Sequence, residues 1–297
     1  MSGMGGMGGM GGMDRGFAPA KVNLALHVTG RAADGYHHLD SLVVFAGTGD
    51  QLSATPAREL SLMVGGPFAR GVPPGEDNLV LRAARALQRR RGVERGASIR
   101  LQKSLPHAAG IGSGSSDAAA AIRLLAHLWG VEPLMPDDPE VLALGSDVPV
   151  CLHAPAPMRM RGRGEVMERA PRLPPCGLVL VNPGVRLPTR DVFDRLGRRD
   201  NGSLPPLPEG AGPEDLAAWL GEARNDLQAP AEALAPPVGE ALALLRGTPG
   251  VLAAVMSGSG ATCVGVTRDV GAARKAARTI QVRAQSWWVA PAPLLAT

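Results

Sequence analysis

The segment from Pro106 to Ala121 carries residue types suited to holding phosphate, in the sequence PHAAGIGSGSSDAAAA. Glycines at alternate positions from Gly110 to Gly114 allow the backbone to turn several N–H groups toward one point. A helix predicted from about Ser116 places the positive end of its dipole beside them. Serines between positions 113 and 116 add hydroxyls that suit phosphate oxygens or a magnesium-bound water. The segment therefore predicts a phosphate-binding loop.

The spacing of this loop differs from the common nucleotide-binding motifs. It has neither the GxxxxGK[ST] of a Walker loop nor the GxGxxG of a dinucleotide-binding fold, so neither family is indicated. Taken alone, a flexible glycine loop before a capped helix is the alternative. A second glycine-rich segment, MSGSGATCVGV at 256–266, allows close backbone approach before a buried strand, although a tight turn explains it equally well.

Two charged residues stand where chemistry would need them. Asp147, in GSDVP, lies where a predicted helix gives way to a predicted strand, because Pro149 favours an extended Val148. Its carboxylate is able to accept a proton from a substrate hydroxyl or to cap a backbone amide. Lys21 begins the apolar strand KVNLALHV and, if it points inward, needs Asp147 or a phosphate as partner; an exposed strand end is the alternative.

Composition bounds the class of protein. A chain of 297 residues, 45% apolar and 20% charged, predicts a globular protein of two modest domains. We expect it in the cytoplasm, since no apolar run approaches the ~20 residues that span a bilayer and the start lacks a signal-peptide pattern. Three separated cysteines indicate neither disulfides nor zinc, and scattered basic residues with 3% aromatics argue against nucleic-acid binding.

Periodicity and turn residues predict an α+β chain whose adjacent strands and intervening helices do not form a regular βαβ array. Residues 1–16 form a Gly/Met tract predicted to be a disordered tail, and residues 161–175 look like a connection between domains. Predicted strands cover 21–28, 39–46, 51–57, 97–105, 148–153, 177–184, 251–266 and 286–292. Predicted helices cover 77–91, 116–129, 139–144, 189–196, 214–220, 238–246 and 270–279.

Three segments, PAKVNLALHV (19–28), LPHAAGIGSGSSDAAAA (105–121) and MSGSGATCVGV (256–266), resemble the three ordered signature motifs of the GHMP kinases. GSDVP (145–149) resembles the catalytic-aspartate segment of that family. The resemblance implies an N-terminal ATP-binding domain of the ribosomal-protein-S5 type at 17–170 and a ferredoxin-like C-terminal domain at 171–297. ATP and substrate are then expected in the cleft between them.

Further segments narrow the resemblance, namely RAADGYHHL (31–39), EDNLVLRAARAL (76–87), LVLVNPGVRLPTRDVF (178–193) and RNDLQAPA (224–231). They resemble members that act on a cytidine-diphosphate-linked polyol. The implied reaction moves the γ-phosphoryl of ATP, with Mg²⁺, to the 2-hydroxyl of 4-diphosphocytidyl-2-C-methyl-D-erythritol in the non-mevalonate isoprenoid pathway. The alternatives are a kinase of the homoserine or mevalonate type and a non-catalytic ligand-binding relative.

The resemblance also implies roles for single residues. Asp147 becomes the base and Lys21 its electrostatic partner, with Asn23 beside them in the substrate site. Cytosine is expected at Tyr36 and His37, helped by Thr189 and Phe193. No role follows for Asn225 and Asp226, and no side chain is assigned as a direct metal ligand. The residues implied to bind ATP are Pro106, His107, Ala108, Ala109, Gly110, Ile111, Gly112, Ser113, Gly114, Ser115, Ser116, Asn78 and Lys103. We expect a monomer or a weak homodimer.

Two departures from the family pattern bear on the site. The loop carries His107, Ala108, Ala109 and Ser113 where the family usually has glycines, so these positions need a negative φ if the cradle is to survive. Prolines at 133, 136 and 139 interrupt a stretch that is usually one helix. We therefore expect a loop and a shortened helix before Asp147.

Overall fold

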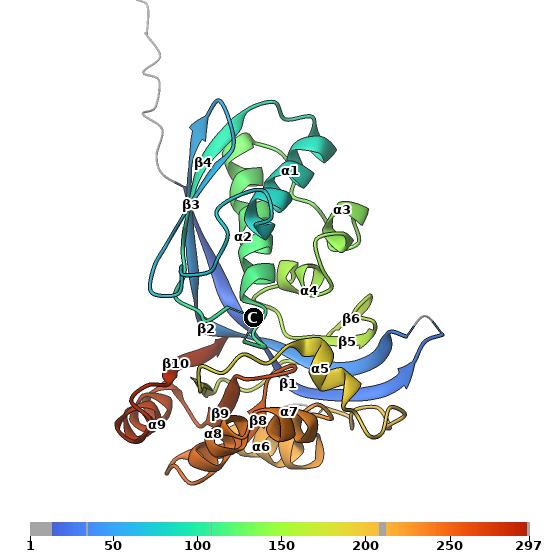
Figure 1. The fold of residues 1–297 in the computed structure, drawn as a ribbon, viewed down its shortest axis with the longest axis vertical. Coiled ribbons are helices and arrows are strands. Elements are labelled where there is room, and N and C mark those ends of the chain that lie inside the picture. The colour runs from blue at the N-terminus through green and yellow to red at the C-terminus, as the bar shows by residue number, and fades with distance from the viewer. Residues whose placement is uncertain (1–13, 34, 108, 208–211, 296–297) are drawn as a thin grey trace, which may run out of the picture.

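A computed structural model describes residues 14–33, 35–107, 109–207 and 212–295. Within these ranges the chain forms one bent sheet with helices in two groups, α1 to α4 at one end and α6 to α9 at the other (Figure 1). The predicted α+β class is thereby confirmed. Residues 1–13 of the predicted tail lie outside the described residues, whereas 14–16 are already part of a strand, which corrects the predicted boundary at residue 16.

The N-terminal half is built on a long antiparallel pair, β1 (Asp14–Arg31) and β2 (His37–Ala57). Strand β4 (Gly96–Gln102) pairs antiparallel with β2, and β3 (Ser61–Gly65) pairs parallel with β4. Side chains of β4 alternate between buried and exposed, as expected for a sheet covered on one face. Apolar residues of α1 (Leu79–Arg91) and α2 (Ser113–Trp129) pack against that covered face.

Capping residues fix both ends of α1 and the end of α2 where the sequence indicated. Asn78 caps α1 by accepting the N–H of Val80 at 2.9 Å, and Gly92 ends it with φ +64°. Gly130 likewise ends α2 in the left-handed region. The start of α2 differs, since it begins at Ser113 rather than near Ser116. Gly112, at φ +55°, turns the chain into the helix three residues earlier.

The C-terminal half carries the antiparallel strand order β10-β7-β9-β8. Helices α8 and α9 follow β7 and β9 along the chain, which gives the β-α-β-β-α-β order of a ferredoxin-like unit. The elements of this half are β7 (Gly177–Asn182), α5 (Thr189–Asp194), α6 (Pro213–Glu222), α7 (Gln228–Leu234), α8 (Pro237–Arg246), β8 (Val251–Met256), β9 (Cys263–Thr267), α9 (Val270–Arg283) and β10 (Trp288–Leu295). Helix α7 was not predicted, because Pro230 interrupts a short segment.

Three predictions about elements were wrong. The segments 39–46 and 51–57 belong to one strand, β2, because β1 pairs along its whole length despite register shifts. The predicted strand after Asp147 is a helix, α4 (Val148–Leu152), because a proline in the first turn costs no helical hydrogen bond. The predicted connection at 161–175 contains the end of β5 (Met158–Gly162) and β6 (Val166–Arg169), which form a hairpin.

The shortened helix before Asp147 is confirmed. Residues 131–138 form a loop, and α3 (Pro139–Leu142) spans only four residues. Asp138 caps α3 by accepting the N–H of Glu140 at 2.9 Å. Ion pairs from the end of α1, Arg89 with Glu140 and Arg90 with Asp138, hold this short helix against the rest of the domain.

Strand β10 joins the two halves into one sheet. It pairs with β7 along most of its length and with β2 at Leu294 and Leu295. The apolar core beneath this junction combines β1 and β2 with β7, β9 and α6. No helix among the described residues has the length and apolar character needed to cross a bilayer.

A buried charge cluster ties the sheet to α2. The ammonium of Lys103, just past β4, donates to Asp50 on β2 at 2.5 Å and to Asp117 on α2 at 2.7 Å. Asp50 also accepts the backbone N–H groups of Ser104 and Leu105 at 2.5 and 2.9 Å. All three charged side chains are almost completely buried, so removing one leaves the others without compensation.

We predict that Lys103→Met lowers the free energy of unfolding by about 3 to 5 kcal/mol, because two carboxylates remain buried without their cation. Urea titration followed by circular dichroism measures the change. Lys275→Met is the matched control, since Lys275 is exposed on α9 and its loss should change stability by less than about 0.5 kcal/mol. Equal stabilities of the two variants would contradict the assignment of the cluster as a structural link.

Candidate active site

The glycine loop opens on the start of α2. The first i→i−4 hydrogen bond of the helix runs from the N–H of Ser116 to the carbonyl of Gly112 at 2.8 Å. The N–H groups of residues 113–115 precede that bond and have no acceptor within the helix. Gly110 and Gly112 take φ values of +74° and +55°, which glycine adopts without strain. The loop thus presents a helix N-terminus whose first N–H groups have no acceptor within the helix, the arrangement that binds anions.

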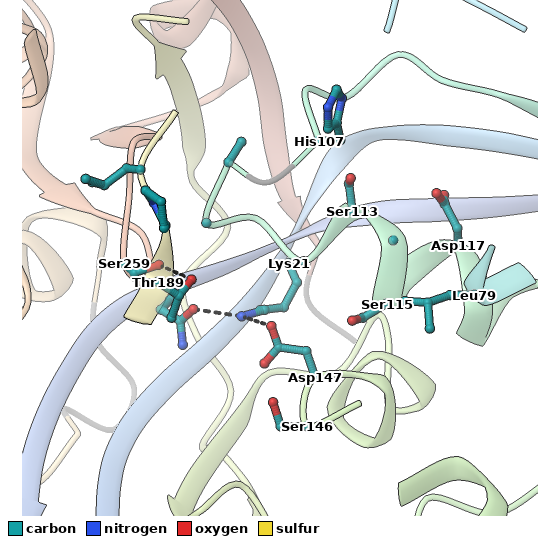
Figure 2. A pocket seen from close by; sticks show the side chains of 18 of the residues that line it. Lys21, Leu79, His107, Ser113, Ser115, Asp117, Ser146, Asp147, Thr189 and Ser259 are labelled. Atoms are coloured by element: carbon teal, nitrogen blue, oxygen red, sulfur yellow. Dashed lines mark hydrogen bonds and ion pairs between the residues drawn. The ribbon is translucent and has the colours of Figure 1, made fainter. Parts of the chain in front are cut away.

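Lys21 and Asp147 form an ion pair beside this loop. Lys21 Nζ lies 2.9 Å from Asp147 Oδ2 and donates to Asn23 Oδ1 at 2.9 Å (Figure 2). The Lys21 side chain is 5% exposed and that of Asp147 32% exposed, so the lysine is fixed inside while the carboxylate faces the cavity. Asp147 stands at the N-cap of α4, but among the described residues its side chain makes no capping hydrogen bond.

These residues meet in a cavity of about 570 Å³ between the two halves of the chain. Its walls include most of the residues implied by the resemblance: Lys21, Asn23, Asn78, Lys103, His107, Ala109, Gly110, Gly112, Ser113, Gly114, Ser115, Asp147, Thr189 and Phe193. Pro106, Ile111 and Ser116 are buried behind the loop and do not line the cavity. Ala108 lies outside the described residues. Ser113 is helical, so its replacement of a glycine is compatible with the cradle.

Packing and hydrogen bonding explain why Ile111 and Ser116 do not line the cavity. The side chain of Ile111 is fully buried in the core beneath β10, and its carbonyl accepts the N–H of Lys21 at 3.0 Å. The hydroxyl of Ser116 donates to the carbonyl of Pro19 at 2.7 Å. Both contacts fix the loop to β1, so these residues position the cradle without lining it.

Only two of the four residues predicted to bind cytosine line the cavity. Thr189 and Phe193, on α5, line the cavity, whereas Tyr36 and His37 do not. The His37 ring stacks on Phe193 with centroids 4.8 Å apart, and the Arg163 guanidinium lies 5.3 Å from the centre of the Tyr36 ring. Burial, reinforced by the charges of Arg199 and Arg31, lowers the pKa of His37, so its ring is neutral at pH 7.

Two residues of the site were not found from the sequence. Asp117 lines the cavity from the first turns of α2, and Asp50 lies behind it on β2. Burial and the neighbouring Asp50 raise the pKa of Asp117 to about 7, against the opposing effect of Lys103. A lysine at 103 and an acid at 117 were visible, but only the folded sheet brings Asp50, 53 positions before Lys103, to the same point.

The cavity wall also includes apolar side chains that the sequence motifs did not mark. Leu26 and Leu39 of the β1–β2 pair, Met160 of β5 and Leu187 before α5 contribute to its walls. Nothing in the sequence motifs marked these residues, because single leucines in strands are ordinary core residues. Among the described residues, no three His, Cys, Asp or Glu side chains cluster as metal ligands.

Comparison with known proteins indicates the same kinase family as the sequence motifs. The chain matches the GHMP kinases N terminal domain over residues 78–155 and the GHMP kinases C terminal domain over 213–283. It is 52% identical over 278 residues to a 4-diphosphocytidyl-2-C-methyl-D-erythritol kinase of Cereibacter sphaeroides, covering 93% of this chain and 97% of that protein.

Solved structures give two further comparisons. A crystal structure of 4-(cytidine 5'-diphospho)-2C-methyl-D-erythritol kinase aligns with a TM-score of 0.77 at 33% identity, covering 95% of this chain and all of that one. Homoserine kinase from Cytophaga hutchinsonii, at 16% identity and a TM-score of 0.66 over 96% of each chain, shares the fold. The chain therefore belongs to the GHMP kinases and, within them, to the 4-diphosphocytidyl-2-C-methyl-D-erythritol kinase family.

Proposed function

We propose that the protein transfers the γ-phosphoryl of ATP to the 2-hydroxyl of 4-diphosphocytidyl-2-C-methyl-D-erythritol, giving the 2-phosphate and ADP. The observation that carries the proposal is the Lys21–Asp147 ion pair at 2.9 Å beside an anion-binding helix N-terminus in the same cavity. A carboxylate that faces the cavity and a buried cation next to it are the groups that an alcohol and a transferring phosphoryl group require.

The glycine loop is proposed to hold the triphosphate. Free N–H groups of the first turn of α2 and the hydroxyls of Ser113 and Ser115 would donate to phosphate oxygens. Phosphoryl transfer passes through a loose transition state, so positioning and charge stabilisation account for most of the acceleration. Lys21 would neutralise charge that develops on the transferred group, while Asp147 orients the acceptor hydroxyl and takes its proton.

Magnesium is proposed as the partner of ATP in this reaction. Since no three His, Cys, Asp or Glu side chains of the described residues come together as metal ligands, the ion would depend mainly on phosphate oxygens. The hydroxyl of Ser115, on the cavity wall, fits the oxygen ligands that Mg²⁺ prefers. When bound, Mg²⁺ neutralises charge on the phosphates.

The substrate end of the cavity suits a pyrimidine. Phe193 offers a ring face from the cavity wall, and the neutral His37 ring stacked on it carries a buried Nε2 without a hydrogen-bond partner among the described residues. His37 is thus proposed to support the Phe193 ring on which cytosine stacks, and Tyr36 to offer a second aromatic face. Asn78 and Lys103, on the loop side, are proposed to lie near the adenosine.

Supplying the purified protein with ATP and each candidate alcohol, and following ADP, tests the reaction directly. We expect turnover with the cytidine-bearing polyol and none above background with homoserine or mevalonate. Comparable turnover with either of those two would move the assignment elsewhere among the GHMP kinases. Binding of the polyol without ADP formation would indicate a non-catalytic relative.

Replacing the carboxylate tests the base. Asp147→Asn keeps the shape of the side chain but removes its charge and proton acceptor, so we expect kcat to fall by at least ~100-fold while ATP still binds. Asp138→Asn is the control, since Asp138 also occupies an N-cap but lies outside the cavity. Near-normal kcat for Asp147→Asn, measured by ADP release, would leave Asp147 with a structural role only.

A single methyl group tests the loop. A Cβ at Gly112 would lie 2.9 Å from Lys21 Cε, whereas one at Gly130, at the other end of α2, would meet nothing within 4 Å. Both glycines have positive φ, so alanine strains the backbone similarly at each. We predict that Gly112→Ala weakens ATP binding and lowers kcat by at least ~10-fold while Gly130→Ala affects stability alone. Calorimetric titration with ATP and steady-state kinetics distinguish them, and matching losses would refute the prediction.

Removing the aromatic side chains tests cytosine recognition. Tyr36→Ala and His37→Ala should each raise KM for the cytidine-bearing substrate by roughly 5- to 100-fold, the range expected for a lost stacking contact, with ATP affinity nearly unchanged. His38→Ala, at the exposed neighbouring position, should leave both constants near the wild-type values. Losses that are equal for ATP and substrate, or absent for both, would exclude this turn from cytosine binding.

A further inference from the structure

The turn from Met256 to Gly260 is a junction between parts of the site that lie far apart in the sequence. The hydroxyl of Ser257 accepts the backbone N–H of Asn23 at 3.0 Å and donates to the carbonyl of Gly110 at 2.8 Å. Two residues on, the Ser259 hydroxyl lies 2.9 Å from that of Thr189 (Figure 2). One turn thus contacts the phosphate loop, the strand that carries Lys21, and the substrate side of the cavity.

The side chain of Asn225 holds this turn from behind. Its amide nitrogen donates to the carbonyls of Met256 and Gly258, both at 2.8 Å, and its Oδ1 accepts the N–H of Leu227 at 2.9 Å. Asn225 is buried, and these three bonds use both of its N–H donors. No aspartate could replace it, because an ionised carboxylate has no proton to donate to the two carbonyls.

Asn225 is itself fixed to β1. Its neighbour Asp226 accepts the N–H of Val28 at 2.7 Å through Oδ2 and the guanidinium of Arg224 at 2.7 Å through Oδ1. The backbone adds two further bonds, from Leu26 N–H to Arg224 O and from Asp226 N–H to Leu26 O. The segment 224–226 therefore transmits the position of β1 to the turn.

We propose that Asn225 is a positioning residue for phosphoryl transfer. By holding the carbonyls of Met256 and Gly258 it keeps Ser257 where its hydroxyl locks the phosphate loop to β1, and so aligns the loop with Lys21 and Asp147. The inference rests on the kinase activity proposed above. It gives Asn225 and Asp226 separate tasks, since Asn225 acts on the turn and Asp226 on the strand.

A double-mutant cycle tests this connection. Asn225→Ala and Ser257→Ala should each lower kcat by at least ~10-fold, because loop and acceptor are misaligned, with a smaller change in KM for ATP. If Asn225 acts through Ser257, the double variant should be no slower than the slower single variant. Multiplicative losses in the double variant would overturn the proposal, as would wild-type kcat in Asn225→Ala.

A further variant separates a loss of stability from a loss of alignment in the site. Thr248→Ala removes another buried hydrogen bond, from the Thr248 hydroxyl to the carbonyl of Leu244 at 2.7 Å, away from the cavity. It should lower Tm while leaving kcat unchanged, and a kcat loss equal to that of Asn225→Ala would show that general destabilisation explains both. If Asn225→Ala does not fold, Asn225→Ser retains a donor at this position and completes the same cycle. Wild-type protein is assayed first, so that absence of ADP there refutes the proposed function rather than the role of Asn225.

Discussion

Direct backbone contact between the phosphate loop and the turn 256–260 is the constraint on which the cavity depends. A Cβ at Gly110 would lie 2.5 Å from the carbonyl oxygen of Ser257 and 2.6 Å from that of Gly260, so only glycine permits the approach. The contact joins a helix of the N-terminal half to the sheet of the C-terminal half. Pairing of β10 with both β2 and β7 holds the two halves at that distance. The cavity proposed to receive the two substrates is therefore formed where the halves touch.

Charge is distributed unevenly around this contact. Lys103 is already compensated by Asp50 and Asp117, which together carry more negative charge than it carries positive when both are ionised. Burial and the neighbouring Asp50 raise the pKa of Asp117 to about 7, and Lys103, whose charge is already paired, adds little attraction for a phosphate group. Attraction for phosphate must then come from the start of α2 and from Lys21. The charge of Lys21 is paired with that of Asp147, whose carboxylate is partly exposed to the cavity. The buried cation Lys21 thus lies directly beside Asp147, the carboxylate proposed to accept the proton during transfer.

Most residues of the candidate site could be predicted from the sequence, whereas fewer of the contacts between distant segments could be. Lys21, Asp147 and the glycines and serines of the loop were marked by residue type and spacing, and the structure brings Lys21, Asp147, Gly110, Gly112, Ser113, Gly114 and Ser115 into one cavity. Helix ends were predictable where a cap and a glycine stand together, as at Asn78 and Gly92. The helix after Asp147 was not, because a residue before proline usually favours extended backbone and only the tertiary fold shows that Pro149 begins a helical turn. Contacts across long separations, such as Asn225 with Met256, leave no local pattern at all.

The apolar residues of the cavity wall bear on why an alcohol rather than water would receive the phosphoryl group. Leu26, Leu39, Met160 and Leu187 line the same cavity as the Lys21–Asp147 pair and offer no side-chain hydrogen bonds to water. A substrate whose cytidine end is held near Phe193 would displace the remaining water from these walls and place its own hydroxyl at Asp147. Binding energy gained at the distant base then serves to orient the reacting oxygen. Recognition of the base and suppression of ATP hydrolysis are, on this argument, consequences of the same contacts.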